Sequence, residues 1–188
     1  MAVSDLLKRP AVVFSAIALI GVVFAAAGIF SELSDKKQQA QDPAAVKGIV
    51  SQPRPEFTLP DLTGAPHAIK EWDGKVIAIN FWATWCPPCK REIPSFNALQ
   101  AEMGAAGLQF VGIAIDDHKS VVEYTQDTTI SYPVLVSEED GIAVAQQYGN
   151  TTGILPYTVI IDRQGRVAFA RYGELSEATA RQVILSLL

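Results

Sequence analysis

The chain has 188 residues, of which 49% are hydrophobic, and its 15 Lys and Arg against 20 Asp and Glu give a net charge of −5. This composition supports one domain with a sizeable core plus an extension, and it excludes the basic character of a nucleic-acid-binding protein. Two cysteines and two histidines leave few side chains for a metal site.

A long uncharged run lies near the start of the chain. Residues 10–30 carry no charged side chain, and these 21 residues, at about 1.5 Å per helical residue, reach about 31 Å, enough to cross a bilayer core of about 30 Å. We therefore expect a transmembrane anchor over 10–30, with residues 1–9, which include Lys8 and Arg9, on the cytoplasmic side. A cleaved signal peptide is the alternative, because Ala25-Ala26-Ala27 offers a cleavage site.

Residues 31–52 are polar and rich in Gln, Ala, Lys and Asp, which is typical of a linker. The globular domain is expected over residues 53–188. It opens with two short segments, around 57–59 and 67–69, that are separated by a turn at 62–64. This pattern predicts a β-hairpin.

Both cysteines lie three residues apart, at the junction between a predicted strand and a predicted helix. The apolar, β-branched run 76–81 predicts a buried strand. After the cysteines, Ile93, Phe96, Leu99 and Met103 recur at helical spacing, which predicts an amphipathic helix.

The position of the pair gives its two sulfur atoms different roles. Pro87 and Pro88 suit the first positions of the helix, where a missing N–H costs nothing. Cys86 then lies at the helix N-terminus, where unpaired N–H groups and the helix dipole stabilise a thiolate, so we expect it to be the nucleophile. Cys89, one turn later and more buried, is the expected resolving thiol, and Trp85 would cover the site from its edge.

Three other uses of a Cys-x-x-Cys pair fit this sequence less well. A zinc site needs about four ligands, and His67 and His118 lie far from the cysteines in the sequence and from each other. Covalent haem attachment needs a histidine directly after the second cysteine, where this chain has Lys90. A purely structural disulfide across so short a loop would stabilise the fold little.

The rest of the domain alternates strands and helices. The further elements expected are strands over 108–115, 132–136, 157–162 and 167–171, and helices over 120–128, 139–148 and 176–188, the last capped by Ser176. This order predicts a mostly parallel sheet with helices on both faces. His118 is expected in the loop after the strand 108–115, as a plain surface histidine or, alternatively, as a proton shuttle near the cysteines.

Residues 81–94, Phe-Trp-Ala-Thr-Trp-Cys-Pro-Pro-Cys-Lys-Arg-Glu-Ile-Pro, resemble the active-site segment of the thioredoxin superfamily. More narrowly, they resemble that of the TlpA/ResA-like membrane-anchored thiol:disulfide oxidoreductases, and the resemblance covers residues 53–188. It implies a thioredoxin-like α/β fold with an N-terminal β-hairpin and a central helix–strand–helix insertion, preceded by one transmembrane helix.

The resemblance also implies how a partner protein would be held. Pro156 would have a cis peptide bond, pack against the cysteine pair and keep metals off the thiols. It would leave the Leu155 backbone free to pair with a bound segment, and Trp85, Pro87 and Pro88 would contact the same segment.

Two residues near the cysteines are expected to tune their chemistry. Glu92 lies on the helical face of Cys89 and, by resemblance, is the candidate general base. An exposed carboxylate, or one paired with Lys or Arg, is the alternative. Asn80 stands where thioredoxin has a buried aspartate.

The function implied is the reduction of disulfides in periplasmic proteins, during cytochrome c maturation or metal-site assembly, without a cofactor. The implied setting is the bacterial inner membrane, crossed once, with a monomeric catalytic domain in the periplasm and a transmembrane thiol reductase as electron donor. Because Pro87 and Pro88 supply no N–H to Cys86, the couple should be more reducing than that of the oxidant DsbA.

Two other functions are weighed against this one. A peroxiredoxin-like peroxide reductase would need Thr-x-x-Cys, whereas Thr84 lies only two residues before Cys86. A non-catalytic thiol metallochaperone could use the same cysteines, but the sequence contains no cluster of Met or His to support it.

Overall fold

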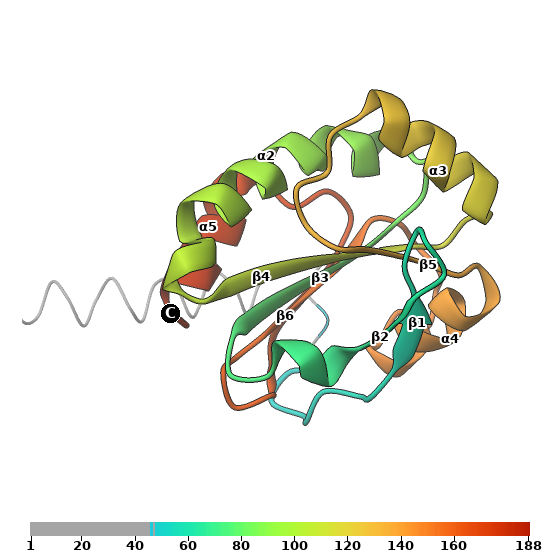
Figure 1. Ribbon diagram of the computed structural model, residues 1–188. Helices are drawn as coiled ribbons and strands as arrows, with labels where there is room; N and C mark the ends of the chain where they lie inside the picture. The colour runs from blue at the N-terminus through green and yellow to red at the C-terminus, as the bar shows by residue number, and fades with distance from the viewer. Residues whose placement is uncertain (1–45, 47) are drawn as a thin grey trace, which may run out of the picture. The chain divides into compact units, whose positions relative to one another are not determined.

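The structure is a computed structural model that describes residue 46 and residues 48–188 (Figure 1). The expected transmembrane anchor at 10–30 and most of the expected linker lie outside the described residues. Within the described part of the chain, no helix combines the length and apolar character needed to cross a membrane.

Five strands form the central sheet in the order β5-β4-β3-β6-β7. They are β3 (Val76–Trp82), β4 (Leu108–Ala114), β5 (Val134–Val136), β6 (Tyr157–Ile161) and β7 (Val167–Tyr172). β3 lies at the centre, parallel to β4 and antiparallel to β6. The strand that leads to the cysteines is therefore paired along both edges.

The prediction of a mostly parallel sheet is wrong. β4 pairs in parallel with β3 and β5, but β6 pairs antiparallel with both β3 and β7. β6 and β7 are antiparallel because a tight turn joins them. In this turn the Asp162 carboxylate accepts hydrogen bonds from the N–H groups of Gln164 and Arg166 at 2.9 and 2.8 Å. So short a connection can join only antiparallel strands.

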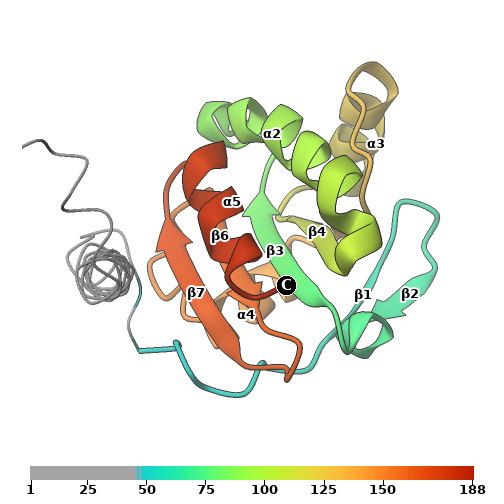
Figure 2. The same ribbon diagram turned by 90° about the vertical axis from the view of Figure 1, so that its left-hand side faces the viewer.

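Helices cover both faces of the sheet (Figures 1 and 2). On one face lie α2 (Pro87–Met103), which runs into the short 3₁₀ helix η3 (Gly104–Ala106), and α5 (Glu177–Leu185). On the other face lies α4 (Glu139–Gln147). Helices on both faces were predicted, and the structure confirms them.

Alternate residues of β3 face two separate cores. Ile77, Ile79 and Phe81 pack in the core on the α4 side, whereas Val76 and Ala78 pack beneath α2 and α5. Successive side chains of a strand point to opposite faces, so a strand buried on both faces is apolar throughout. This explains the continuous apolar run.

The apolar stripe predicted for α2 is confirmed. Ile93, Phe96, Leu99 and Met103 are all buried. The ring of Phe96 stacks on that of Phe110 in β4, with 4.8 Å between centroids. This packing fixes α2, and with it the cysteines, against the sheet.

The predicted N-terminal hairpin is present as β1 (Thr58–Pro60) and β2 (Pro66–Ala68), followed by the 3₁₀ helix η2 (Ile69–Trp72). The hairpin touches the sheet edge through a bridge between Asp61 and Leu135 of β5. At the opposite edge, residues 51–54 pair with the start of β7. Both edges of the sheet are thus covered, which protects them from pairing with other chains.

The predicted central insertion consists of α3 (His118–Asp127), β5 and α4. The expectation that His118 lies in a loop is wrong, because α3 begins at this residue. Asp117 is the N-cap and accepts the Ser120 N–H at 2.9 Å, which starts the helix two residues earlier than predicted. The predicted Ser176 cap of α5 is confirmed by its bond from the Thr179 N–H at 3.2 Å.

Candidate active site

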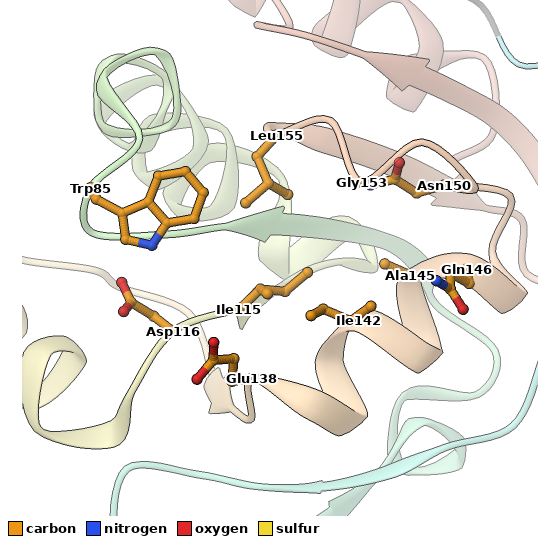
Figure 3. A pocket seen from close by; sticks show the side chains of 10 residues that line it. All are labelled: Trp85, Ile115, Asp116, Glu138, Ile142, Ala145, Gln146, Asn150, Gly153 and Leu155. Carbon is orange, nitrogen blue, oxygen red and sulfur yellow. The ribbon is translucent and has the colours of Figure 1, made fainter.

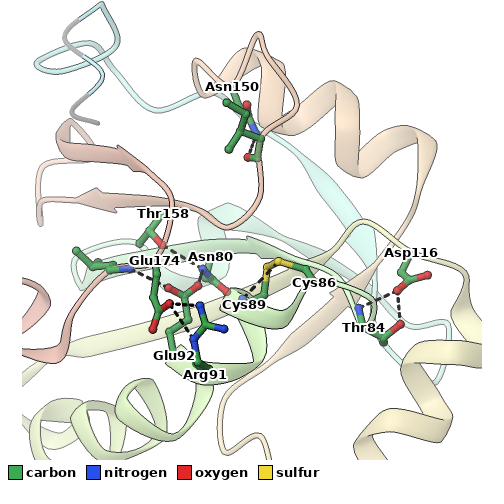
Figure 4. The surroundings of a disulfide bond; sticks show 12 residues. Asn80, Thr84, Cys86, Cys89, Arg91, Glu92, Asp116, Asn150, Thr158 and Glu174 are labelled. Atoms are coloured by element: carbon green, nitrogen blue, oxygen red, sulfur yellow. Dashed lines mark hydrogen bonds and ion pairs between the residues drawn. A yellow bond between two sulfur atoms is a disulfide. The ribbon is translucent and has the colours of Figure 1, made fainter. Parts of the chain in front are cut away.

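Cys86 and Cys89 form a disulfide at the junction between the end of β3 and the start of α2 (Figure 4). Cys86 is the N-cap of the helix, and its Sγ accepts the Cys89 N–H at 3.3 Å. Cys86 is 3% exposed and Cys89 is fully buried. The expected order of burial is confirmed, with the difference that Cys86 is itself nearly covered.

The two prolines limit how many donors reach the Cys86 sulfur. Pro87 and Pro88 occupy the first two helical positions and have no N–H, so the amide of Cys89 is the first one in the helix that donates to Cys86 Sγ. A thiolate at Cys86 would therefore receive one backbone hydrogen bond from this turn where a proline-free turn can offer more. The helix dipole still favours the thiolate.

Asp116 holds the loop that leads to Cys86, a role that the sequence did not suggest. Its carboxylate accepts the Thr84 N–H at 2.9 Å and the Thr84 hydroxyl at 2.6 Å (Figure 4). β3 and β4 are parallel neighbours, so the residues that follow them adjoin at one end of the sheet. The available signal was an acidic residue directly after the second of two adjacent buried strands.

Glu92 is buried beneath the site. It is 2% exposed, Oε1 accepts a hydrogen bond from Asn80 Nδ2 at 2.7 Å, and Oε2 accepts the Leu175 N–H at 3.0 Å. Burial raises the pKa of Glu92 to about 7, and the hydrogen bonds from Leu175 and Asn80 oppose that rise. The alternative of an exposed carboxylate is wrong, because Glu92 is buried. The alternative of an ion pair is wrong, because the Glu92 oxygens bond to Asn80 and Leu175, and the neighbouring Arg91 pairs instead with Glu174 at 2.6 Å.

Asn80 extends this network across the sheet. Its Nδ2 also donates to Thr158 Oγ1 at 3.0 Å, whereas its Oδ1 is buried without a partner among the described residues. Thr158 lies directly opposite Asn80 on β6. The amide thus links the central strand, its neighbour and Glu92 of the helix.

The peptide bond between Leu155 and Pro156 is cis, as predicted. Leu155 is half-buried and packs against the cluster that contains both cysteines. Among the described residues, none hydrogen-bonds to the amide or the carbonyl of Leu155. The Leu155 backbone thus lies beside the disulfide, and its N–H and C=O groups have no hydrogen-bond partner among the described residues.

The other predicted contact residues surround the disulfide on the outside. Trp85 is 65% exposed, Pro87 is exposed and Pro88 is half-buried. A large exposed indole directly before Cys86 gives the site an apolar surface. Trp85 flanks the cysteines and leaves its ring open to a partner.

The two histidines lie away from this arrangement. His118 Nε2 bonds to the Leu62 carbonyl at 2.9 Å and so ties α3 to the hairpin. His67 lies between Glu71 and Asp61 on the hairpin, at 2.8 and 3.3 Å. In the described part of the chain, no three His, Cys, Asp or Glu side chains gather as a metal site would require.

Known proteins share this sequence pattern and fold. Residues 50–170 match the AhpC/TSA family. A thiol-disulfide oxidoreductase ResA of Geobacillus thermodenitrificans is 31% identical over 139 residues, which cover 73% of this chain and 78% of the relative.

Two solved structures extend the comparison. A thiol:disulfide interchange protein of the thioredoxin family from Chlorobium tepidum is 33% identical, with a TM-score of 0.64 over 72% of this chain and 94% of that one. A secreted disulfide oxidoreductase of Mycobacterium tuberculosis, described as homologous to E. coli DsbE, is 25% identical, with a TM-score of 0.60 over 70% and 96% of the two chains. The chain belongs to the AhpC/TSA family of the thioredoxin superfamily and is a TlpA/ResA-like thiol-disulfide oxidoreductase.

Proposed function

We propose that this oxidoreductase acts as a reductant of disulfides in other proteins, with Cys86 as nucleophile and Cys89 as resolving thiol. The observation that carries the proposal is the different environment of the two sulfur atoms. Cys86 is the helix N-cap beside the exposed Trp85, whereas Cys89 is fully buried on the same helix as the buried Glu92. Cys86, although only 3% exposed, is the cysteine nearer the surface and can meet a substrate sulfur, whereas Cys89 can meet only Cys86.

The reaction is a two-step thiol–disulfide exchange. The Cys86 thiolate attacks one sulfur of the substrate disulfide, which forms a mixed disulfide and releases one substrate thiolate that takes up a proton. The Cys89 thiol then loses its proton and attacks Cys86 Sγ, which forms the Cys86–Cys89 disulfide and releases the second substrate thiol. Two electrons and two protons pass to the substrate, and an external dithiol must return them.

Glu92 is the proposed acceptor of the Cys89 proton. A carboxyl group with a pKa of about 7 exchanges protons readily near neutral pH, which a general base requires. The bonds from Asn80 Nδ2 and the Leu175 N–H hold both carboxylate oxygens in place. Asn80 acts here as a positioning residue.

The setting proposed is the outer side of a bacterial inner membrane, with residues 10–30 as a single-pass anchor and the catalytic domain, a monomer, in the periplasm. The uncharged 10–30 segment and the description of one relative as secreted support this setting. The proposed electron donor is a transmembrane thiol reductase. The proposed substrates are disulfides of proteins that mature outside the cytoplasm, such as apocytochromes c or metal-site assembly proteins.

A trapping experiment tests the order of the two thiols. The reduced Cys89→Ser chain should accumulate a mixed disulfide with a protein substrate such as insulin, because Cys86 can attack but nothing can resolve the adduct. The Cys86→Ser chain should accumulate none. Trapping by Cys86→Ser and not by Cys89→Ser would contradict the assignment, and loss of insulin reduction by the wild type would contradict the function.

A further inference from the structure

Asn150 is a buried polar residue that the reaction described above does not use. It lies in the connection from α4 to β6, five residues before Leu155, and is 1% exposed. Its Nδ2 donates to the Ile154 carbonyl at 3.0 Å (Figure 4). Its Oδ1 accepts the Thr152 hydroxyl at 3.4 Å. Both ends of this buried amide are thus bonded within one loop, an arrangement that favours a single loop conformation.

The backbone that carries the Asn150 side chain is itself held by two elements. The Asn150 N–H donates to the Ala145 carbonyl of α4 at 2.8 Å. The carbonyl of the preceding residue, Gly149, accepts the Tyr172 hydroxyl of β7 at 2.8 Å. Because α4 and β7 hold this backbone, and the side chain is short and buried, the position of the Asn150 amide is determined by the folded domain.

The residues between Asn150 and Leu155 are, by contrast, all exposed to solvent. Ile154 is 50% exposed, although it is large and apolar. Exposed loops with few packed side chains open at a low cost in free energy. The bond from Asn150 to the Ile154 carbonyl closes this loop across three exposed residues, and it acts directly before Leu155.

This hydrogen bond acts on the peptide group that contains the Leu155 N–H. The carbonyl of Ile154 and the N–H of Leu155 belong to one planar peptide group, which is trans. In a trans peptide group the C=O and the N–H point in opposite directions. Because the Ile154 carbonyl points to the buried Asn150 amide, the Leu155 N–H points away from Asn150.

The Leu155 N–H is available to a bound chain. It has no partner among the described residues, and Leu155 packs against the cluster that contains both cysteines. A free backbone N–H in such a place can donate to a backbone carbonyl of an extended partner segment. A hydrogen bond accepted by the C=O of the same peptide group also polarises the N–H and strengthens it as a donor.

We propose that Asn150 is a positioning residue, which orients the Leu155 N–H so that it can donate to a backbone carbonyl of the substrate protein. It acts through the Ile154 carbonyl and needs no contact of its own with the substrate. Reduction of a disulfide that is carried by a polypeptide should depend on Asn150, whereas reduction of a small disulfide without peptide groups should not. This inference rests on the proposed reductase function and deepens it.

Two substrates test the inference on the reduced full-length chain. One is a blocked peptide with a central cysteine between alanines, held as its mixed disulfide with 2-mercaptoethanol, and the other is hydroxyethyl disulfide. The kcat/KM for the peptide is divided by that for the small disulfide. Asn150→Ala should lower this ratio about five- to tenfold, the effect of about one hydrogen bond. The matched control Asn97→Ala should keep the ratio, because the Asn97 Nδ2 likewise donates to a backbone carbonyl, that of Thr129 between α3 and β5, at 2.8 Å.

A second variant, Asn150→Asp, adds a pH profile that a purely structural role would not produce. The ionised carboxylate cannot donate to the Ile154 carbonyl, but the protonated acid can. The ratio for Asn150→Asp should therefore be low at pH 8 and rise toward the wild-type value as pH falls to 5. The ratios for the wild type and for Asn97→Asp should change little over the same range.

An unchanged ratio in Asn150→Ala, or no recovery of Asn150→Asp at low pH, would overturn the inference and leave the proposed function standing. An equal loss on both disulfides would also overturn it, because Asn150 would then act on the cysteines or on the fold. Failure of the wild type on both disulfides would count against the proposed function itself. Because each ratio is taken within one variant, a smaller folded fraction changes none of these outcomes.

Discussion

Beneath Cys89 the site is a closed polar network, whereas around Cys86 it is an open and largely apolar surface. The inner side contains Glu92, Asn80 and Thr158, all buried and joined by hydrogen bonds of 2.7 and 3.0 Å. The outer side contains the exposed Trp85 and a groove lined by Trp85, Leu155 and Ile142 (Figure 3). The difference indicates that the two sides have different functions, since the inner side is suited to transfer a proton and the outer side to recognise the partner protein.

The largest effect should come from removing the inner carboxylate. In Glu92→Gln, resolution of the mixed disulfide at pH 7 should slow about 10²- to 10³-fold, because the amide cannot accept the Cys89 proton. In the wild type this step should accelerate as pH rises through about 7, where Glu92 loses its proton, and then level off. Rapid-quench measurement of mixed-disulfide decay gives the rate, with Glu174→Gln as the matched exposed control.

The second effect is a pH dependence of stability to which the inner side contributes through Glu92. Because burial raises the pKa of Glu92 from 4.5 to about 7, the folded chain binds this proton more tightly than the unfolded chain. The stabilisation of the folded chain by this proton is fully present below pH 4.5 and is lost as pH rises to about 7. The free energy of unfolding should fall by up to about 3 kcal/mol over this range.

Denaturant unfolding of the oxidised chain between pH 4 and pH 8 checks this expectation. Glu92→Gln should flatten the decline and be the more stable protein at pH 8. An equal decline in the variant and the wild type would show that Glu92 is not held in a desolvated state.

The smallest effect should come from the outer side, and it should separate binding from stability. Trp85→Ala should lower kcat/KM for a protein disulfide about tenfold, because exposed tryptophans often anchor partners. The free energy of unfolding should change by less than about 0.5 kcal/mol, since the ring is 65% exposed. A large loss of stability with unchanged kinetics would assign Trp85 to the fold and would remove the distinction between the two sides.

The sequence predicted those parts of the fold that depend on local pattern. The apolar run of β3, the stripe of α2, the hairpin, the central insertion and the Ser176 cap were all found. The antiparallel direction of β6 beside β3 was missed, because strand direction was inferred from the general alternation of elements. The start of α3 was missed because Asp117 caps it.

In the candidate site, too, the residues that a local pattern marks were predicted, and those that depend on contacts between distant parts of the chain were not. Cys86, Cys89 and Pro156 are set by a short motif and by resemblance to a family. The burial of Glu92 depends on Asn80 and on the amide of Leu175, which is 83 residues away in the chain. The bond from Thr84 to Asp116 spans 32 residues. Such partners are set by the packing of the whole domain, and no local pattern shows which residue each of them contacts.

The reduction potential of the Cys86–Cys89 pair in the full-length chain tests the central claim most directly. Equilibration in dithiothreitol or glutathione buffers, followed by thiol alkylation, gives the value. Because the two prolines withhold N–H donors from the Cys86 thiolate, we expect a potential near or below the roughly −270 mV of thioredoxin. A value near the roughly −120 mV of DsbA would make the protein an oxidant and would contradict its assignment as a reductant.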